Sequence, residues 1–196
     1  MVNDILHRKE RLVITTIEII DELGIQKLST REIARRQEIS EATLFRHFRS
    51  KNDLLITVLD YYSQFDSDIY QSTKLKDIGA KEKIQYYINS YAEYYENYPQ
   101  ITSIMQVLDV LRYETELTER IIEIQNTRTN FLIQLIGEAK KAGEIKPDTD
   151  SGQLTDIILG IVREICFRWR MNGRNFSLKK QIMSTLEVAL QAFIGI

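Results

Sequence analysis

The sequence predicts an all-α protein of about nine helices, and three observations lead to this fold class. Apolar residues recur at spacings of three and four, the period of a helix buried on one side, rather than at the spacing of two that a strand shows. The 196 residues include only 8 Gly and 2 Pro, too few for the many turns of an all-β fold. Isoleucine is abundant and favours strands by propensity, but it follows the helical spacing. We therefore expect a few long helices.

These helices follow one another along the chain with recognisable ends. Leu12 and Ile19 lie on the inward face of the first helix, and Gly24 stands where a helix-terminating residue is expected. Pro99 follows a tyrosine-rich segment and can open the next helix, whereas Pro147 lies in a turn. On this basis we expect helices at about 4–23, 30–37, 41–48, 51–72, 80–97, 100–112, 116–142, 150–171 and 177–194.

The second and third of these helices are short and lie close together in the sequence. Ser29 or Thr30 can cap the first of the two and Ser40 the second, because a side-chain oxygen there accepts a hydrogen bond from the backbone of the next turn. The small Ala34 stands where the two helices must approach each other. Two short helices joined by a tight turn form a helix-turn-helix, whose second helix can enter the major groove of DNA.

The charge distribution fits a nucleic-acid partner for this segment, although the net charge of the whole chain is −2. Residues 1–52 contain ten Lys and Arg against eight Asp and Glu, whereas residues 53–196 contain sixteen against twenty. Within residues 24–52 the balance is seven basic residues against three acidic ones. Residues 24–52 thus carry a local excess of basic residues in a chain whose net charge is negative. A local basic excess is typical of a DNA-binding module.

Several classes of protein are disfavoured by what the sequence lacks. No apolar run approaches the roughly 20 residues of a transmembrane helix, and residues 1–11 are too rich in charge for a secretory signal. The single cysteine, Cys166, cannot form an internal disulfide. His7 and His47 are the only histidines, and no glycine-rich phosphate loop or nucleophile motif occurs. We therefore expect a cytoplasmic protein with no membrane partner, no metal, no cofactor and no catalytic site.

The helix-turn-helix segment resembles the DNA-binding region of TetR-family transcriptional repressors over about residues 10–56. Residues 30–34, Thr-Arg-Glu-Ile-Ala, are similar to the second helix of that family. Residues 39–48, Ile-Ser-Glu-Ala-Thr-Leu-Phe-Arg-His-Phe, are similar to its recognition helix, and residues 49–55 to the entry of its fourth helix. The chain length and the all-helical remainder agree with this resemblance.

Two positions depart from the family pattern. Glu38 occupies the turn position where glycine is common, so a non-glycine residue there has to adopt a left-handed conformation or the turn has to relax. Phe45 stands where the family often has tyrosine, and it keeps the packing while losing a hydroxyl that can reach a phosphate. Neither departure removes the helix-turn-helix pattern.

Residue roles at the expected DNA interface follow partly from chemistry and partly from the resemblance. Arg46 has a planar guanidinium suited to guanine or phosphate, Thr43 can touch a thymine methyl, and Glu41 can accept from cytosine. The resemblance implies phosphate contacts for Thr30, His47 and Lys51. The alternative is that these charges form a solvated helix surface, with His47 capping the helix. The full candidate set is Thr30, Arg31, Ser40, Glu41, Ala42, Thr43, Phe45, Arg46, His47 and Lys51.

The larger C-terminal part is marked by tyrosines at helical spacing. Tyrosine combines apolar area with a polar tip and can line a pocket for an amphipathic ligand, although packing in the core explains the same stripe. The resemblance implies an effector pocket between the middle helices, and it leaves drugs, flavonoid-like molecules and acyl chains equally open. The candidate pocket residues are Tyr87, Tyr91, Tyr94, Tyr95, Met105, Leu108, Arg112, Phe131, Leu135, Ile161, Ile165 and Arg168.

The helix expected at 150–171 is apolar on more than one face, so it must be covered on more than one side. One cover is the rest of the chain, and a second copy best explains the other. The resemblance implies that the last two helices of each subunit form this two-fold interface. Arg168 lies four residues after Glu164, so either an ion pair or an anchor for an acidic effector accounts for it. The candidate interface residues are Ile157, Gly160, Glu164, Phe167, Met171, Ile182, Leu186, Leu190 and Phe193.

Together these features predict a helix-turn-helix DNA-binding domain at 1–52 and an effector-binding and dimerisation domain at 53–196. The expected function is that of a homodimeric repressor, which binds a near-palindromic double-stranded DNA operator and is released by an apolar or amphipathic small molecule. The main alternative is a helical ligand-binding or scaffolding protein whose helix-turn-helix does not bind DNA. An enzyme is the third and weakest interpretation.

Overall fold

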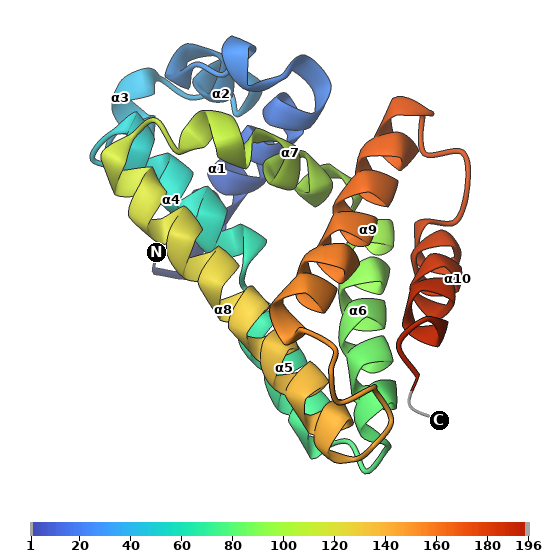
Figure 1. The fold of residues 1–196 in the computed structure, drawn as a ribbon. Helices are drawn as coiled ribbons and strands as arrows, with labels where there is room; N and C mark the ends of the chain where they lie inside the picture. The colour runs from blue at the N-terminus through green and yellow to red at the C-terminus, as the bar shows by residue number, and fades with distance from the viewer. Residues whose placement is uncertain (1, 195–196) are drawn as a thin grey trace. The chain divides into compact units, whose positions relative to one another are not determined.

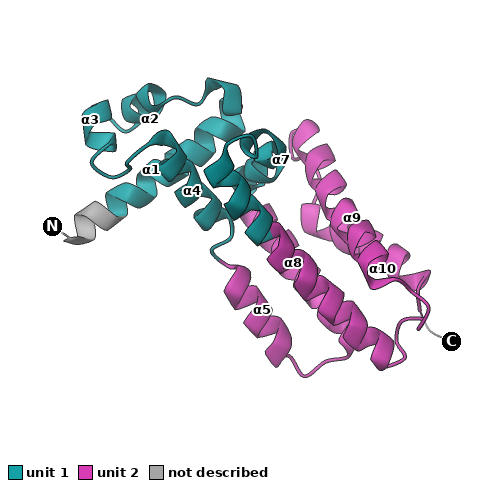
Figure 2. Ribbon diagram, turned by 60° about the vertical axis from the view of Figure 1, so that its left-hand side comes forward, with its two compact units in different colours: residues 1–64, 99–124 teal, residues 65–98, 125–196 magenta. Residues whose placement is uncertain are grey.

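The computed structural model describes residues 2–194, with the side chains of residues 7–194, and it confirms the all-α fold (Figure 1). Within this part of the chain the only extended pairing is an isolated bridge between Ile145 and Ile194. The chain forms two compact units (Figure 2). Residues 1–64 and 99–124 make up the first unit, and residues 65–98 and 125–196 make up the second.

The first unit is built around the long helix α1 (Val2–Leu23), which packs against α2, α4 and α7. Its core contains Leu12, Ile17 and Ile20 from α1, together with Leu44 and Leu54 from the helices that follow. Its elements are α1, η1 (Ile25–Lys27), α2 (Thr30–Arg36), α3 (Glu41–Leu44), α4 (Lys51–Tyr62), η2 (Pro99–Ile101), α7 (Thr102–Leu111) and residues 115–124 of α8 (Thr115–Lys141).

The second unit contains α5 (Asp66–Leu75), α6 (Ala80–Asn97), residues 125–141 of α8, α9 (Ser151–Met171) and α10 (Leu178–Gln191). Here α10 packs against both α6 and α9, and α5 packs against α6. Ile84, Leu154 and Leu186 are fully enclosed in this core. The single thiol, Cys166, is also fully buried, and its burial raises the pKa of the thiol to about 12.

Local sequence signals explain where most helices begin and end. The side chains of Ser29, Ser50 and Asp150 each accept a hydrogen bond from a backbone N–H in the first turn of α2, α4 and α9 respectively. Gly24 follows α1 with φ 80°, a conformation that glycine adopts without steric cost, so the predicted end of the first helix is confirmed. None of the helices in residues 2–194 has both the length and the apolar run needed to cross a bilayer.

The segment 51–72, expected as one helix, is interrupted at residues 63–65 between α4 and α5. The Ser63 hydroxyl donates to the Leu59 carbonyl at 3.0 Å, a local bond that competes with helix continuation. The Phe65 ring packs edge-on against the Tyr94 ring, with centroids 5.0 Å apart. The backbone therefore turns here, and Asp66 becomes the first residue of a new helix.

The two compact units divide the chain differently from the predicted domains. In the sequence the division lies after residue 52, whereas the first unit continues to residue 64 and regains residues 99–124. This happens because η2 and α7 pack on α1. The functional assignment of 1–52 and 53–196 stays a prediction.

Candidate nucleic-acid interface and effector site

The helix-turn-helix of the first unit forms as the sequence predicts. Ser40 caps α3 by accepting from the Thr43 N–H at 3.2 Å, and the Ile39 N–H bonds back to the Ala34 carbonyl at 3.0 Å. Glu38 in the turn has φ 53°, so this non-glycine residue does adopt the left-handed conformation, at a cost of about 1–2 kcal/mol. The turn keeps its shape despite the missing glycine.

Buried contacts fix the position of α3 within the unit. Ile33, Ala34 and Leu44 are almost fully buried where α2 and α3 meet. The Gln37 side chain donates to the Thr15 hydroxyl of α1 at 2.7 Å, which ties the turn to the long helix. Regular α-helix covers only residues 41–44 instead of the expected 41–48, because Arg46 and His47 bond three residues back in a tighter turn.

Four of the predicted DNA-contacting residues bond to one another. The Thr30 hydroxyl donates to the Glu41 carboxylate at 2.6 Å, which joins the start of α2 to the start of α3. The hydroxyls of Ser40 and Thr43 lie 3.0 Å apart. These bonds orient the N-terminal end of the recognition helix before any partner binds. The sequence did not indicate the link between Thr30 and Glu41, since the two residues are eleven positions apart.

The remaining candidates differ in their exposure. Arg31, Ala42, Phe45 and Arg46 are exposed, and His47 is half-buried. The Lys51 ammonium donates to the Leu28 carbonyl at 3.0 Å, which leaves other protons of the same ammonium for a second acceptor. The exposed residues among 41–46 thus combine the carboxylate of Glu41 and the guanidinium of Arg46 with the small Ala42 and the apolar Phe45. Such a surface suits a groove edge.

Glu32 neutralises part of the basic excess that the sequence shows. Its carboxylate accepts two hydrogen bonds at 2.8 Å from the Arg35 guanidinium and one at 3.0 Å from Arg36. Arg36 also pairs with Glu22 at 2.8 Å. The hydrogen bonds from Arg35 and Arg36 lower the pKa of Glu32 to about 2, so this carboxylate stays ionised under ordinary conditions.

In the second unit, three of the predicted tyrosines are buried in a row along α6. Tyr87, Tyr91 and Tyr95 are nearly inaccessible, and Tyr94 is half-buried. The ring centroids of Tyr87 and Tyr91 lie 5.2 Å apart, and the Tyr87 ring lies 5.1 Å from that of Phe131 on α8. We call the rings of Tyr70, Tyr87, Tyr91 and Phe131 the aromatic wall. Leu135, another candidate, is buried one helical turn beyond Phe131.

A buried ion pair lies at the polar tips of these tyrosines. Arg128 of α8 donates from Nε and Nη2 to the two carboxylate oxygens of Asp66 of α5, each at 2.8 Å. The Tyr91 hydroxyl donates to the same carboxylate at 2.8 Å, and Arg128 Nη1 lies 3.3 Å from the Tyr95 hydroxyl. Asp66 is 8% and Arg128 7% exposed. We call Asp66, Arg128, Tyr91 and Tyr95 the polar node.

Neither charged member of the polar node, Asp66 or Arg128, was among the residues predicted from the sequence. A signal was present: Arg128 lies four residues after Ile124 and three before Phe131, so it falls on the apolar stripe of its helix. Asp66 similarly lies between Tyr62 and Ile69, which are both buried. A charge on a buried stripe implies a buried partner, but the stripe does not name that partner.

The other candidate pocket residues lie on α7, just after it, and on α9. Met105 and Leu108 are buried on α7, which belongs to the first unit, and the exposed Arg112 pairs there with Asp109 at 2.7 Å. Arg168 is exposed on α9, with its guanidinium 5.8 Å from the Phe176 ring. On the same helix Ile161 is half-buried and Ile165 is buried.

The predicted interface residues split into two groups. On α9 the exposed fractions are 43% for Ile157, 46% for Phe167 and 70% for Met171, and Gly160 and Glu164 are exposed as well. The prediction was wrong for three residues of α10, which point into the core against α6 and α9 and are at most 2% exposed. Those three are Ile182, Leu186 and Leu190. Phe193 is half-buried.

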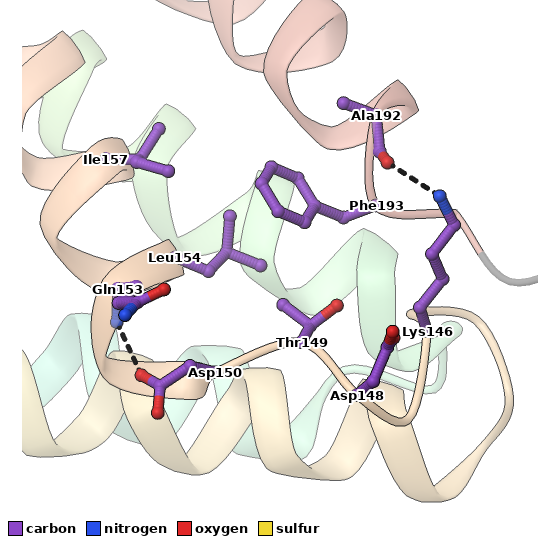
Figure 3. Close-up of a pocket in the computed structure, with 9 residues that line it drawn as sticks. All are labelled: Lys146, Asp148, Thr149, Asp150, Gln153, Leu154, Ile157, Ala192 and Phe193. Atoms are coloured by element: carbon purple, nitrogen blue, oxygen red, sulfur yellow. Dashed lines mark hydrogen bonds between the residues drawn. The ribbon is translucent and has the colours of Figure 1, made fainter.

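A pocket of about 350 Å³ lies between the start of α9 and the end of α10 (Figure 3). The Lys146 ammonium donates to the Ala192 carbonyl at 3.0 Å, and the Asp150 carboxylate caps α9 beside it (Figure 3). Ile157 and Phe193, both predicted for the dimer interface, line this pocket. None of the candidate effector residues lines this pocket, so this pocket is not the one that the sequence predicted.

Comparison with family models covers nearly the whole chain. Residues 13–58 match the model of bacterial regulatory proteins of the tetR family. Residues 61–192 match the model of the C-terminal region of YsiA-like proteins. The first match contains the helix-turn-helix, and the second contains the aromatic wall and the polar node.

Individual proteins are similar over the same length. The fatty acid metabolism regulator protein of Bacillus subtilis is 26% identical over 179 residues, which cover 91% of each chain. The crystal structure of the transcriptional regulator FadR from Bacillus subtilis in complex with stearoyl-CoA superposes with a TM-score of 0.81 at 25% identity, over 94% of this chain and 98% of that one. The ketosteroid transcriptional regulator KstR2 of Mycobacterium tuberculosis shares the fold, with a TM-score of 0.83 at 16% identity over 96% of each chain.

Proposed function

Because the chain belongs to the TetR family of bacterial regulatory proteins and is a DNA-binding transcriptional regulator, we propose that it represses from a near-palindromic operator as a homodimer and is released by a small-molecule effector. The main support is the preorganised recognition helix, with Arg46 exposed and Glu41 held by Thr30, inside the matched segment. In this proposal the protein acts in the cytoplasm, without a membrane partner.

At the operator, two recognition helices would occupy successive major grooves with centres about 34–36 Å apart. Arg46 and Thr43 would read base edges, whereas Arg31 and Lys51 would contact phosphates. The bond between Thr30 and Glu41 leaves the second Glu41 oxygen as an acceptor for a cytosine amino group. Residues 30–51 would thus provide both the affinity and the choice of sequence.

Replacing Arg46 by alanine tests this assignment. We expect a labelled fragment from the region flanking the protein's own gene to be bound specifically, and Arg46→Ala to weaken that binding at least about tenfold, because a bidentate contact is worth about 1–3 kcal/mol per head. Fluorescence anisotropy at several salt concentrations measures the affinity of the wild type and of the variant for this fragment. Arg112→Ala, an arginine outside the helix-turn-helix, is the control and should bind as the wild type does. Equal affinity of the Arg46 variant would remove Arg46 from the interface.

Glu32→Gln is expected to strengthen binding to DNA of any sequence. Without the carboxylate, Arg35 loses its two charge-assisted bonds and Arg36 keeps only Glu22, so up to two more cations per subunit become available to phosphates. The plot of log affinity against log salt should steepen by about one unit for each added phosphate contact. Glu38→Gln removes the same charge from the adjacent turn and should change the slope less. An unchanged slope would mean that neither arginine reaches the DNA.

The homodimer is supported by the exposed apolar face of α9. Ile157, Gly160, Phe167 and Met171 recur at spacings of three, seven and four, so they lie along one side of the helix. A Cβ added at Gly160 would meet nothing within 4 Å, which leaves room for the close approach of a second helix. On α10 the exposed Val188 replaces the three core residues as a candidate for the same surface.

For the effector we propose a long-chain acyl compound. The FadR regulator from Bacillus subtilis was crystallised with stearoyl-CoA, and in the comparison of sequences a Bacillus subtilis relative is named a fatty acid metabolism regulator. In the present chain the aromatic wall offers apolar surface, and the polar node offers donors for one polar group. An effector that binds better to the DNA-incompatible conformation lowers operator affinity by the difference in its two binding energies.

A further inference from the structure

The polar node is a carboxylate-binding site that the chain itself occupies. Arg128 presents two N–H groups to Asp66 in the side-by-side geometry that guanidinium uses for any carboxylate, and Tyr91 adds a third donor at 2.8 Å. The Arg128 guanidinium also lies over the Tyr91 ring, 4.9 Å from its centroid. The Tyr70 hydroxyl of α5 also donates to Asp66, at 3.5 Å, so four donors converge on this one carboxylate, and three of them come from α6 and α8.

The helix that delivers Asp66 has few buried residues of its own. On α5 only Asp66, Ile69 and Thr73 are buried, and Leu75 at its end is 83% exposed. The Thr73 hydroxyl bonds to its own helix at the Ile69 carbonyl, so it adds no link to a neighbour. At the exposed end of α5, the Lys83 ammonium of α6 donates to the Lys74 carbonyl at 3.4 Å, and the Lys74 ammonium lies 5.6 Å from the centroid of the Phe131 ring of α8. The Asp66 contacts are the buried polar attachment of α5 to α6 and α8.

An aromatic surface lies where α5 packs. The Tyr70 ring of α5 is 4.7 Å from the Phe131 ring and 6.1 Å from the Tyr87 ring, centroid to centroid. A displacement of α5 would expose Phe131, Tyr87 and Tyr91 while leaving Arg128 on α8. The exposed surface would then be an apolar lining with one cation and two phenol hydroxyls at its end, which suits an acyl chain that ends in a carbonyl group.

We propose that Arg128, with the hydroxyls of Tyr91 and Tyr95, binds the carboxylate or thioester carbonyl of a long-chain acyl effector in exchange for Asp66, and that the acyl chain takes the place of α5 on the rings of Phe131, Tyr87 and Tyr91. This inference rests on the proposed function and names the residues that recognise the effector. In the structure described here the site is closed, with Asp66 as the intramolecular occupant.

Two further observations agree with this exchange. Burial raises the pKa values of Tyr87 and Tyr91 well above the usual range, so their hydroxyls remain protonated donors. Asp66 is separated from Tyr62, the last residue of α4, by only three residues. Release of Asp66 would therefore free the residue that directly follows the segment 63–65, in which the chain passes from the first unit to the second.

Direct binding measurements on the full chain test the exchange. Calorimetric titrations would use stearate, stearoyl-CoA and stearyl alcohol with four proteins: wild type, Asp66→Asn, the double variant Asp66→Leu/Arg128→Met, and Lys179→Met. The last removes an exposed cation that pairs with Glu93 in the same unit and serves as the control. Stearyl alcohol lacks the carbonyl group and reports on the apolar surface alone.

We expect Asp66→Asn to bind stearate at least about tenfold more tightly than the wild type, because the competing carboxylate loses its charge while Arg128 remains. The double variant should bind stearate at least about tenfold more weakly than the wild type, because it lacks the cation. Lys179→Met should change nothing. If Asp66→Asn raises the affinity for stearate alone, the site binds carboxylates. If it raises the affinity for stearoyl-CoA as well, the site binds acyl carbonyls. Both results support the exchange.

The inference is overturned if both variants shift the stearate affinity in the same direction, as a purely structural ion pair would, or if neither shifts it. It is also overturned if the wild type binds neither acyl probe, and the acyl effector of the proposed function then fails with it. Operator binding by the unliganded protein, measured separately by anisotropy, decides the repressor function independently of these results. Acyl binding with unchanged affinities in both variants would therefore overturn the exchange at Arg128 while leaving the acyl effector of the proposed function in place.

Discussion

Replacing Arg128 by methionine alone is expected to lower the free energy of unfolding by about 3–5 kcal/mol, the largest effect on stability of any single substitution considered for this protein. Asp66 would remain nearly inaccessible to water, with only two uncharged donors, the Tyr91 hydroxyl at 2.8 Å and the Tyr70 hydroxyl at 3.5 Å. An uncompensated buried charge is far more costly than the loss of one hydrogen bond. Urea unfolding followed by circular dichroism measures the change.

The double variant Asp66→Leu/Arg128→Met should recover most of that loss, because apolar side chains of similar volume replace both charges and leave none unpaired. The control, Lys179→Met, breaks an exposed pair with Glu93 and should cost less than about 1 kcal/mol. If the double variant were as unstable as the single one, the ion pair itself would stabilise the fold. If Arg128→Met were as stable as the wild type, Asp66 would have to find another partner or reach solvent.

The helix-turn-helix could be predicted because its signals are local. Ser29 and Ser40 bond to backbone groups three residues away, and Gly24 needs only its own backbone freedom to end α1. For Glu38 the position predicted either a left-handed residue or a relaxed turn, and the left-handed conformation is the one observed. The side-chain hydrogen bonds across the turn, such as that between Thr30 and Glu41, could not be predicted. The spacing of residues in the sequence does not indicate which exposed groups meet.

The candidate effector site was predicted only in part, since its charged members are far apart in sequence. Helical spacing identified the tyrosine face of α6 as special, and three of those tyrosines do gather in the second unit. Asp66 and Arg128 are separated by 62 positions, so no local pattern could pair them. The same limit explains α10, where the apolar stripe was correct but its partner is the chain's own core rather than a second copy.

The operator affinity of this protein is expected to depend on the exposed face of α9. Phe167→Glu should convert the homodimer into a monomer, because two-fold symmetry places the new carboxylate of each copy in the same apolar interface. Native mass spectrometry and sedimentation velocity measure the mass. The fold of the monomer should persist, since the Phe167 side chain is 46% exposed within its own chain and contributes little to the core.

Loss of the dimer should weaken operator binding at least about a hundredfold, because one head no longer raises the effective concentration of the other at its half-site. The modest charge of each head makes this dependence strong, since Glu32 and Glu22 already occupy Arg35 and Arg36. Leu75→Glu changes an exposed apolar residue of the same unit on α5 and should leave both the dimer and the DNA affinity unchanged. A dimeric Phe167→Glu protein would place the interface elsewhere. A monomeric variant with full operator affinity would instead show that a single head suffices for binding.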